Sequence, residues 1–176
     1  TEKSAVRTCG QEFQNTRHRG PRFSAQTSGS TGTPLQLSRD LDSINAENAF
    51  LWRFWRAHGK QPGSRRATVR ADLITDVRDD RLWVYNRFNH ELLASAFHLN
   101  DQAMEKIVDR LREFGAYDLY AYPSTAFVLA DYVRRSGKQL GFGAVFTSSE
   151  QLFPHQKEMI EQQFGDKTVE VRQELS

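Results

Sequence analysis

The feature that most constrains the fold is an alternation of helices and short apolar strands between residues 100 and 171. Apolar side chains recur at helical spacing from Met104 to Phe114; Asn100 or Asp101 caps this predicted helix and Gly115 ends it. The alternation continues with a strand over 117–122, a helix capped by Ser124, a strand over 142–146, a helix from Pro154 to Gly165 and a strand at 169–171. Strands joined by helical crossovers lie parallel to one another. The pattern therefore predicts an α/β fold with a mainly parallel sheet and crossover helices.

The first hundred residues carry weaker patterns. Residues 1–26 show no clear periodicity and predict an irregular N-terminal segment. Asp40 precedes a run with one apolar face, which predicts a helix that ends at Gly59. Alternating side chains predict further strands over 67–71, 82–85 and 93–99. In a parallel sheet, ligands gather beyond the carboxyl ends of the strands, where the loops at 122–124 and 147–150 are expected.

The composition of the chain narrows the class of protein. Its 176 residues suit one α/β domain, or one lobe of a larger protein, over the whole of 1–176. The 24 basic and 22 acidic residues leave a net charge of only +2, which disfavours nucleic acid as the partner. No apolar run is long enough to predict a membrane span. Cys9 is the only cysteine, which excludes a disulfide framework and favours a cytoplasmic location.

Two clusters of charged residues allow more than one interpretation. The arginine-rich stretch 53–87 fits one wall of an anion site, but a solvated, ion-paired surface is favoured. The aspartates between 72 and 80 suggest a metal-binding loop, but Arg70, Arg78 and Arg81 lie among them, so a salt-bridged turn is favoured. The five histidines have no metal-ligand spacing.

The strongest chemical signal is the nine-residue loop Thr27-Ser28-Gly29-Ser30-Thr31-Gly32-Thr33-Pro34-Leu35. Its two glycines let the backbone turn N–H groups toward a polyphosphate, and its five hydroxyls add donors and magnesium ligands. The loop lacks the lysine and the spacing of a Walker loop. A flexible linker rich in serine, glycine and threonine has the same composition, so the residues alone leave both interpretations open.

This loop resembles the phosphate-binding signature of the adenylate-forming superfamily, in the branch that holds phenylacetate–CoA ligases and CapK-like proteins. Two later segments resemble the same branch. Tyr122-Pro123-Ser124, followed by a helix, resembles the turn beside the family's acyl pocket. Phe146-Thr147-Ser148-Ser149-Glu150, followed by a helix and Phe164-Gly165, resembles the segment that borders adenine. The order and spacing of the three segments agree with the family over roughly residues 20 to 170.

The resemblance implies an AMP-forming carboxylate ligase and part of the family's N-terminal domain. ATP and Mg²⁺ would bind together with a small-molecule carboxylic acid, which becomes an acyl-adenylate and passes to coenzyme A or another thiol. The residues implied are Thr27, Ser28, Gly29, Ser30, Thr31 and Gly32 at the ATP phosphates, Ser148, Ser149 and Glu150 on the nucleotide side, Tyr122 and Ser124 in the acyl pocket, and Thr31 and Glu174 at Mg²⁺. The resemblance assigns no catalytic side chain.

The sequence also departs from the family pattern. The family's Tyr-Gly-x-x-Glu motif is absent where Val169-Glu170-Val171-Arg172-Gln173-Glu174 stands, and Glu174 is the nearest counterpart of its glutamate. The ribose-binding aspartate, the hinge and the small C-terminal domain with its catalytic lysine are absent too. We therefore expect an incomplete catalytic unit. The alternatives are a non-catalytic nucleotide-binding or interaction module on the same fold and, less favoured, an arginine-rich nucleic-acid binder; a homo-oligomer is left open.

Overall fold

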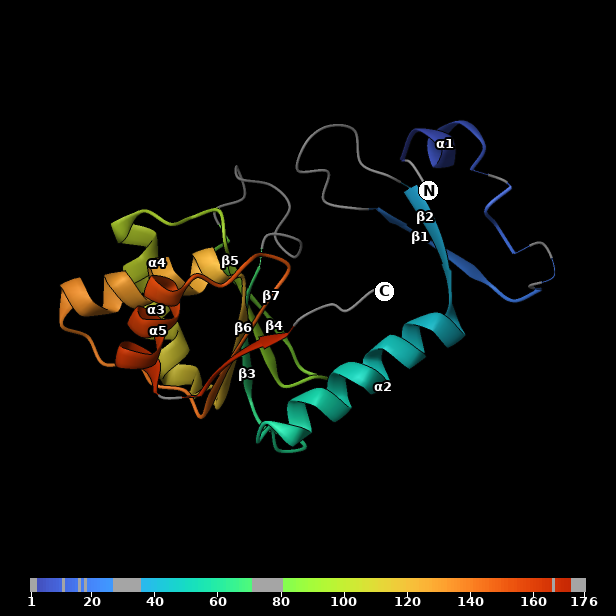
Figure 1. Ribbon diagram of the computed structural model, residues 1–176. Helices are drawn as coiled ribbons and strands as arrows, with labels where there is room; N and C mark the ends of the chain where they lie inside the picture. The colour runs from blue at the N-terminus through green and yellow to red at the C-terminus, as the bar shows by residue number, and fades with distance from the viewer. Residues whose placement is uncertain are drawn as a thin grey trace. The chain divides into compact units, whose positions relative to one another are not determined.

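A computed structural model describes residues 3–10, 12–15, 17, 19–26, 36–70, 81–165 and 167–171. The predicted phosphate loop (residues 27–35), the acidic stretch 72–80 and Glu174 lie outside these ranges. The chain forms two compact units, Thr1–Trp55 and Arg56–Ser176. Figure 1 shows the elements of both units, and each unit is described by itself.

The first unit is built on an antiparallel strand pair. Its elements are α1 (Lys3–Thr8), β1 (Arg22–Gln26), β2 (Gln36–Asp40) and most of α2 (Leu41–Ala57). Arg22 lies opposite Asp40 and Gln26 opposite Gln36, so the two strands that flank the predicted phosphate loop are paired at its ends. The Asp40 carboxylate accepts a hydrogen bond of 2.7 Å from the Ser43 amide, which confirms Asp40 as a helix cap.

The N-terminal segment is more regular than the sequence indicated. Residues 1–26 were expected to be irregular, whereas α1 and β1 form within them. The helix has six residues and the strand five, which is too short for either period to stand out from the surrounding polar sequence.

The second unit contains a six-stranded sheet in the order β4-β5-β3-β6-β7-β8. The strands are β3 (Arg66–Arg70), β4 (Trp83–Asn86), β5 (Glu91–Ser95), β6 (Asp118–Ala121), β7 (Ala144–Ser148) and β8 (Thr168–Val171). Every neighbouring pair is parallel except β4 and β5, which are antiparallel and joined by a short turn. The predicted α/β fold with a mainly parallel sheet is confirmed.

Three crossover helices connect the parallel strands. They are α3 (Asp101–Phe114), α4 (Pro123–Ser136) and α5 (Pro154–Phe164), and Figure 1 shows them gathered on one side of the sheet. The predicted cap of α3 is confirmed, because the Asn100 side chain accepts a hydrogen bond of 2.9 Å from the Ala103 amide. Gly115 follows the helix with φ 63°, a left-handed conformation that glycine adopts without strain.

Some predicted boundaries were wrong by a few residues. The cap of α4 is Tyr122 rather than Ser124, and Pro123 begins the helix because its fixed φ and missing N–H suit the first helical position. Strand β7 covers 144–148 rather than 142–146, and β5 ends at Ser95 rather than continuing toward residue 99.

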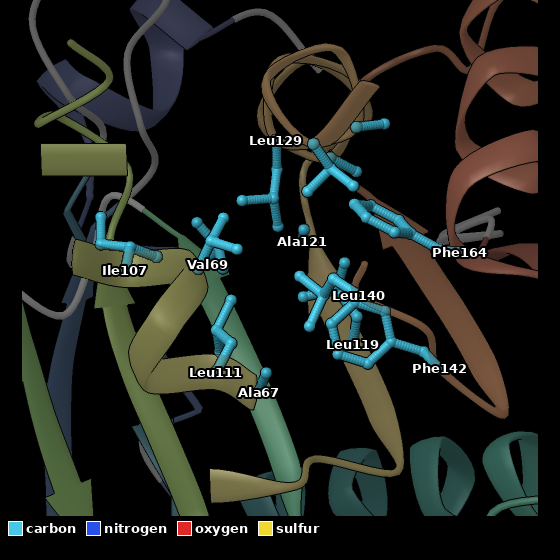
Figure 2. Packing of buried hydrophobic residues seen from close by; sticks show 14 of the residues in the cluster. Ala67, Val69, Ile107, Leu111, Leu119, Ala121, Leu129, Leu140, Phe142 and Phe164 are labelled. Carbon is cyan, nitrogen blue, oxygen red and sulfur yellow. The ribbon is translucent and has the colours of Figure 1, made fainter. Parts of the chain in front are cut away.

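Alternate residues of the parallel strands point toward the helices and form the hydrophobic core. The buried cluster that they share with the helices and the segment before β7 includes Ala67, Val69, Ile107, Leu111, Leu119, Ala121, Leu129, Leu140, Phe142 and Phe164 (Figure 2). The residues that alternate with this set on β3, namely Arg66, Thr68 and Arg70, point to the opposite face, because successive side chains of a strand lie on opposite sides. One face of β3 is therefore apolar and the other polar.

A cluster of buried charges lies where β3 and β6 begin. The Asp118 carboxylate is fully buried and accepts hydrogen bonds from Lys60 Nζ at 3.0 Å to each oxygen, from Arg66 Nε at 2.6 Å and from Ser64 Oγ at 3.0 Å. Burial, and then the neighbouring Arg66, lower the pKa of Lys60 below its ordinary value. This cluster fixes the loop before β3 to the start of β6, at the end of the sheet opposite the predicted ligand loops.

Candidate functional site

The carboxyl ends of three adjacent parallel strands meet at one edge of the sheet. Arg70 ends β3, Tyr122 directly follows β6, and Ser148 ends β7. The register places Ala121 of β6 beside Thr147 of β7. The two predicted segments, 122–124 and 148–150, therefore lie at neighbouring strand ends, which is where ligands bind in parallel sheets.

The Ser148 hydroxyl is the centre of a small hydrogen-bond network. Its Oγ lies 3.0 Å from the hydroxyl of Tyr120 and accepts a hydrogen bond of 2.9 Å from Arg70 Nη1. The residue is 1% exposed, so its hydroxyl is fixed by the protein. The sequence predicted Ser148 in a loop, but it is the last residue of β7. Its buried hydroxyl therefore joins Arg70 and Tyr120 at this edge of the sheet.

Arg70 contacts every part of this network. Its second terminal nitrogen, Nη2, donates a hydrogen bond of 3.3 Å to Ser149 Oγ. The guanidinium carbon lies 4.8 Å from the ring centroid of Tyr120 and 4.6 Å from that of Tyr122, within cation–π range of both. The sequence placed Arg70 in the arginine-rich stretch 53–87 and beside the acidic stretch, but did not single it out as a site residue. The available signal was its position near the carboxyl end of the strand predicted over 67–71.

Ser149 has a left-handed backbone conformation, with φ 70°. This region costs a residue with a Cβ atom of order 1 kcal/mol, and it persists only where the surroundings hold it. Here Arg70 holds the Ser149 hydroxyl, while the next residue, Glu150, is tied to helix α4. The strained residue is thus one for which the family resemblance implies a position on the nucleotide side.

Glu150 joins the two predicted segments directly. Its Oε2 accepts a hydrogen bond of 3.1 Å from the backbone amide of Ser124, in the first turn of α4. A carboxylate at this position is favourable because it satisfies a free helix N–H group and faces the positive end of the helix dipole. The segment predicted on the nucleotide side and the segment predicted on the acyl side are therefore in hydrogen-bond contact.

A serine–histidine pair also lies near this edge, at the end of β5. Ser95 Oγ is 2.8 Å from His98 Nδ1 and accepts a hydrogen bond of 3.2 Å from the Phe97 amide. Ser95 is completely buried, and its hydroxyl stabilises the turn after β5. Within the described ranges, no three His, Cys, Asp or Glu side chains come together as a metal site. None of the helices described has the length and apolar character that a membrane crossing requires.

The structure thus brings together one part of the predicted site. Tyr122, Ser124, Ser148, Ser149 and Glu150 meet at one sheet edge. The phosphate-loop residues Thr27 to Gly32 and the magnesium candidates Thr31 and Glu174 lie outside the described residues. The ligand that each residue would bind remains a prediction.

Comparison with solved structures identifies the class of fold. A 2-hydroxyisobutyryl-CoA ligase, solved in an open conformation with 2-HIB-AMP and CoA, superposes with a TM-score of 0.65 over 97% of this chain and 41% of that chain, at 16% sequence identity. VinN superposes with a TM-score of 0.50 over 85% of this chain and 35% of that chain, at 18% identity. This chain therefore has the fold of part of an adenylate-forming ligase.

Comparison of sequences supports the same resemblance. Protein CapK of Staphylococcus aureus is 25% identical over 143 residues, which are 79% of this chain and 32% of CapK. No protein-family model matches the chain. The resemblance to the CapK-like branch of the adenylate-forming superfamily is confirmed, and the chain spans about a third of the length of that relative.

Proposed function

We propose that this chain is the nucleotide- and acyl-binding part of an AMP-forming carboxylate ligase. In this reaction a carboxylate oxygen of a small acid attacks the α-phosphorus of ATP. The bond between the α-phosphorus and the bridging oxygen breaks, pyrophosphate leaves, and an acyl-adenylate forms. The acyl group then passes to the thiol of coenzyme A or another acceptor, with release of AMP.

The observation that supports this proposal best is the contact between the two predicted segments. Ser148 to Glu150 and Tyr122 to Ser124 lie at adjacent strand ends and are joined by the Glu150–Ser124 hydrogen bond. Adenylation needs the α-phosphorus and the carboxylate side by side, so one site must border both substrates. The ligase that superposes on this chain was solved with an acyl-adenylate and CoA, which fits the same substrate class.

The roles of the residues follow from their positions. Ser148, Ser149 and Glu150 would border the nucleotide, and Tyr122 and Ser124 the acid. Residues 27–32 would bind the ATP phosphates through backbone N–H groups and hydroxyls. Catalysis would then consist of positioning and charge stabilisation, without a nucleophilic side chain.

Magnesium would neutralise charge on the phosphates in such a reaction, with Thr31 and Glu174 as its protein ligands. The carboxylate of Glu150 is engaged with the Ser124 amide, which suits a helix cap better than a metal ligand. We also infer a cytoplasmic location, where ATP and coenzyme A are available to the enzyme.

Titration with Mg-ATP tests whether the chain binds nucleotide at the predicted loop. We expect calorimetry to show binding by the wild type and its loss in Gly29→Val. The matched control is Gly141→Val, because a Cβ atom at this exposed position meets its nearest neighbour, Phe164 O, at an ordinary 3.8 Å. Equal affinity in Gly29→Val and wild type would contradict the phosphate-loop assignment.

A second assay separates a ligase from a non-catalytic module. Carboxylate-dependent exchange of labelled pyrophosphate into ATP, measured on the full-length protein with a panel of small carboxylic acids, reports adenylation directly. Exchange that requires an acid supports the ligase. Mg-ATP binding without exchange for any acid would support a nucleotide-binding module on the same fold.

A further inference from the structure

The side chain of Arg70 links the ends of three strands that are distant in the sequence. It extends from β3, lies over the tyrosine rings at 120 and 122, and donates hydrogen bonds to Ser148 and Ser149. Tyr122 belongs to the predicted acyl-side segment, and the two serines belong to the predicted nucleotide-side segment. A single guanidinium therefore contacts both halves of the proposed site.

We propose that Arg70 is a positioning residue of this site, which holds the Ser148–Glu150 segment in the conformation that borders the nucleotide. This inference rests on the proposed function. Arg70 acts through the two serine hydroxyls and need not touch ATP. Loss of the Arg70–Ser149 hydrogen bond would change the position of Glu150, and with it the hydrogen bond between Glu150 and the Ser124 amide.

The shape of the guanidinium group suits this role. Its planar fork donates through Nη1 and Nη2 to two adjacent hydroxyls, while its face remains available to aromatic rings. A lysine at the same place keeps the positive charge but has a compact ammonium group that cannot match this arrangement. Arg70→Lys therefore separates positioning from a general electrostatic attraction for phosphate.

The backbone of Ser149 shows why the segment needs support. Its left-handed φ of 70° is unfavourable for serine and is held by contacts on either side. On one side, Arg70 bonds the Ser149 hydroxyl; on the other, Glu150 bonds the Ser124 amide. Without the first contact, Ser149 can relax toward ordinary φ values, and the Glu150 carboxylate then moves away from α4.

A neighbouring arginine shows that the two ends of the sheet have different roles. Arg66 also lies near the Tyr120 ring, at 5.6 Å from its centroid, but its Nε bonds the buried Asp118 carboxylate. Arg66 therefore belongs to the buried charge cluster at the amino end of β3. Arg70, four residues later, is the arginine of the same strand face that lies at the carboxyl end.

Two backbone amides in the first turns of α4 provide the measurement. The Ser124 amide donates to Glu150, whereas the Ala126 amide donates to the Tyr122 carbonyl within the helix. Exchange of the Ser124 amide with water, measured by NMR, therefore reports the position of Glu150. Exchange of the Ala126 amide reports the stability of α4 itself.

We expect Arg70→Lys to raise the Ser124 exchange rate by about threefold or more, toward the rate in Glu150→Ala, while Ala126 is unchanged. Arg134→Lys is the matched control. Arg134 lies on α4, the helix that carries both amides, and pairs with Asp131 on the protein surface. A Ser124 rate in Arg70→Lys equal to that of wild type would overturn the proposal. So would an equal rise at Ser124 and Ala126, because that result means a general loss of stability.

Titration of the same variants with Mg-ATP distinguishes this inference from the proposed function. We expect about a tenfold weaker affinity in Arg70→Lys, equivalent to about 1.4 kcal/mol. Wild-type affinity in Arg70→Lys would overturn the positioning role while the proposed function stands. Absence of Mg-ATP binding in wild type would contradict nucleotide binding by this chain, and the Ser124 exchange rates would still decide whether Arg70 positions the segment.

Discussion

We predict that removal of the negative charge of Asp118 destabilises the folded protein, because this buried carboxylate pairs with two buried cations. In Asp118→Asn, the buried cations Lys60 and Arg66 lose the carboxylate that both contact. The side chain of Lys60 is 4% exposed and that of Arg66 is 8% exposed, so water cannot replace the lost partner without local opening. An amide group also offers one acceptor oxygen where the carboxylate has two.

The size of the effect follows from this geometry. Removal of one member of a buried ion pair typically destabilises a protein by about 3–5 kcal/mol, because an uncompensated charge remains buried. Asp118 bonds two cations and one hydroxyl, so we expect a loss in the upper half of this range. A loss this large approaches the whole stability of a marginal domain, which is about 5 kcal/mol.

Lys60→Met provides the matched comparison. It leaves Asp118 bonded to Arg66 and Ser64 and removes a cation whose burial is itself unfavourable. We expect it to cost about 1–2 kcal/mol, the range of ordinary substitutions. In the double variant Asp118→Asn with Lys60→Met, one buried cation is removed together with the anion, so the total loss should be smaller than the sum of the two single losses.

Urea denaturation of the four proteins, followed by circular dichroism, measures these free energies. Mg-ATP affinity of each folded variant serves as a second measurement. Asp118 begins β6 while Tyr122 follows its end, at about 3.3 Å per residue or roughly 13 Å away, so we expect affinity to be unchanged. A cost for Asp118→Asn below about 1 kcal/mol, or full additivity in the double variant, would refute the reasoning.

Three further predictions concern single positions. Because the pKa of Lys60 is lowered in the folded protein, the unfolded chain binds this proton more tightly than the folded chain does. The free energy of unfolding should therefore increase as the pH rises from the lowered pKa to the ordinary value of 10.5. Urea denaturation at pH 7 and pH 10 should show this increase in wild type and its absence in Lys60→Met. Gly165→Ala should cost about 1–3 kcal/mol in thermal unfolding, because φ is 114° and a Cβ atom would lie 3.2 Å from Phe142 O, whereas Gly141→Ala should cost little. The buried Thr147 hydroxyl has no hydrogen-bond partner among the described residues, so Thr147→Val should be neutral or stabilising by up to about 1 kcal/mol in the same assay, while Ser148→Ala should destabilise.

The parts of the fold that the sequence predicted well depend on local chemistry. The start of α3 at Asn100 and its end at Gly115 follow from a side-chain cap and a left-handed glycine, which involve only residues within one turn. The start of β7 was predicted two residues too early. Phe142 and Gly143 are apolar or small like strand residues, but their amides bond Phe164 and Tyr117 outside the strand ladder. Such contacts depend on the folded chain and leave no local pattern.

The same distinction applies to the candidate site. The serines of 148–149 and Tyr122 were found because they belong to short contiguous segments. Arg70 was not, because its hydrogen bonds span 78 and 79 residues and arise only when β3, β6 and β7 become neighbours. The contact between Glu150 and the α4 amide is hidden for the same reason. Sequence identified the candidate segments, and topology supplied the residue that contacts both of them.

The two faces of β3 carry a consequence for variation among proteins of this kind. Ala67 and Val69 sit in the packed core, where volume decides what is tolerated and alanine or valine accepts only small apolar replacements. Arg66 and Arg70, on the other face, are held by charge and hydrogen-bond geometry. Within five consecutive residues, the rules for accepted substitutions therefore alternate at every step. Substitutions that change side-chain size at Ala67 or Val69 would therefore reduce stability, whereas loss of the charge at Arg70 would change the candidate site and leave the core packing intact.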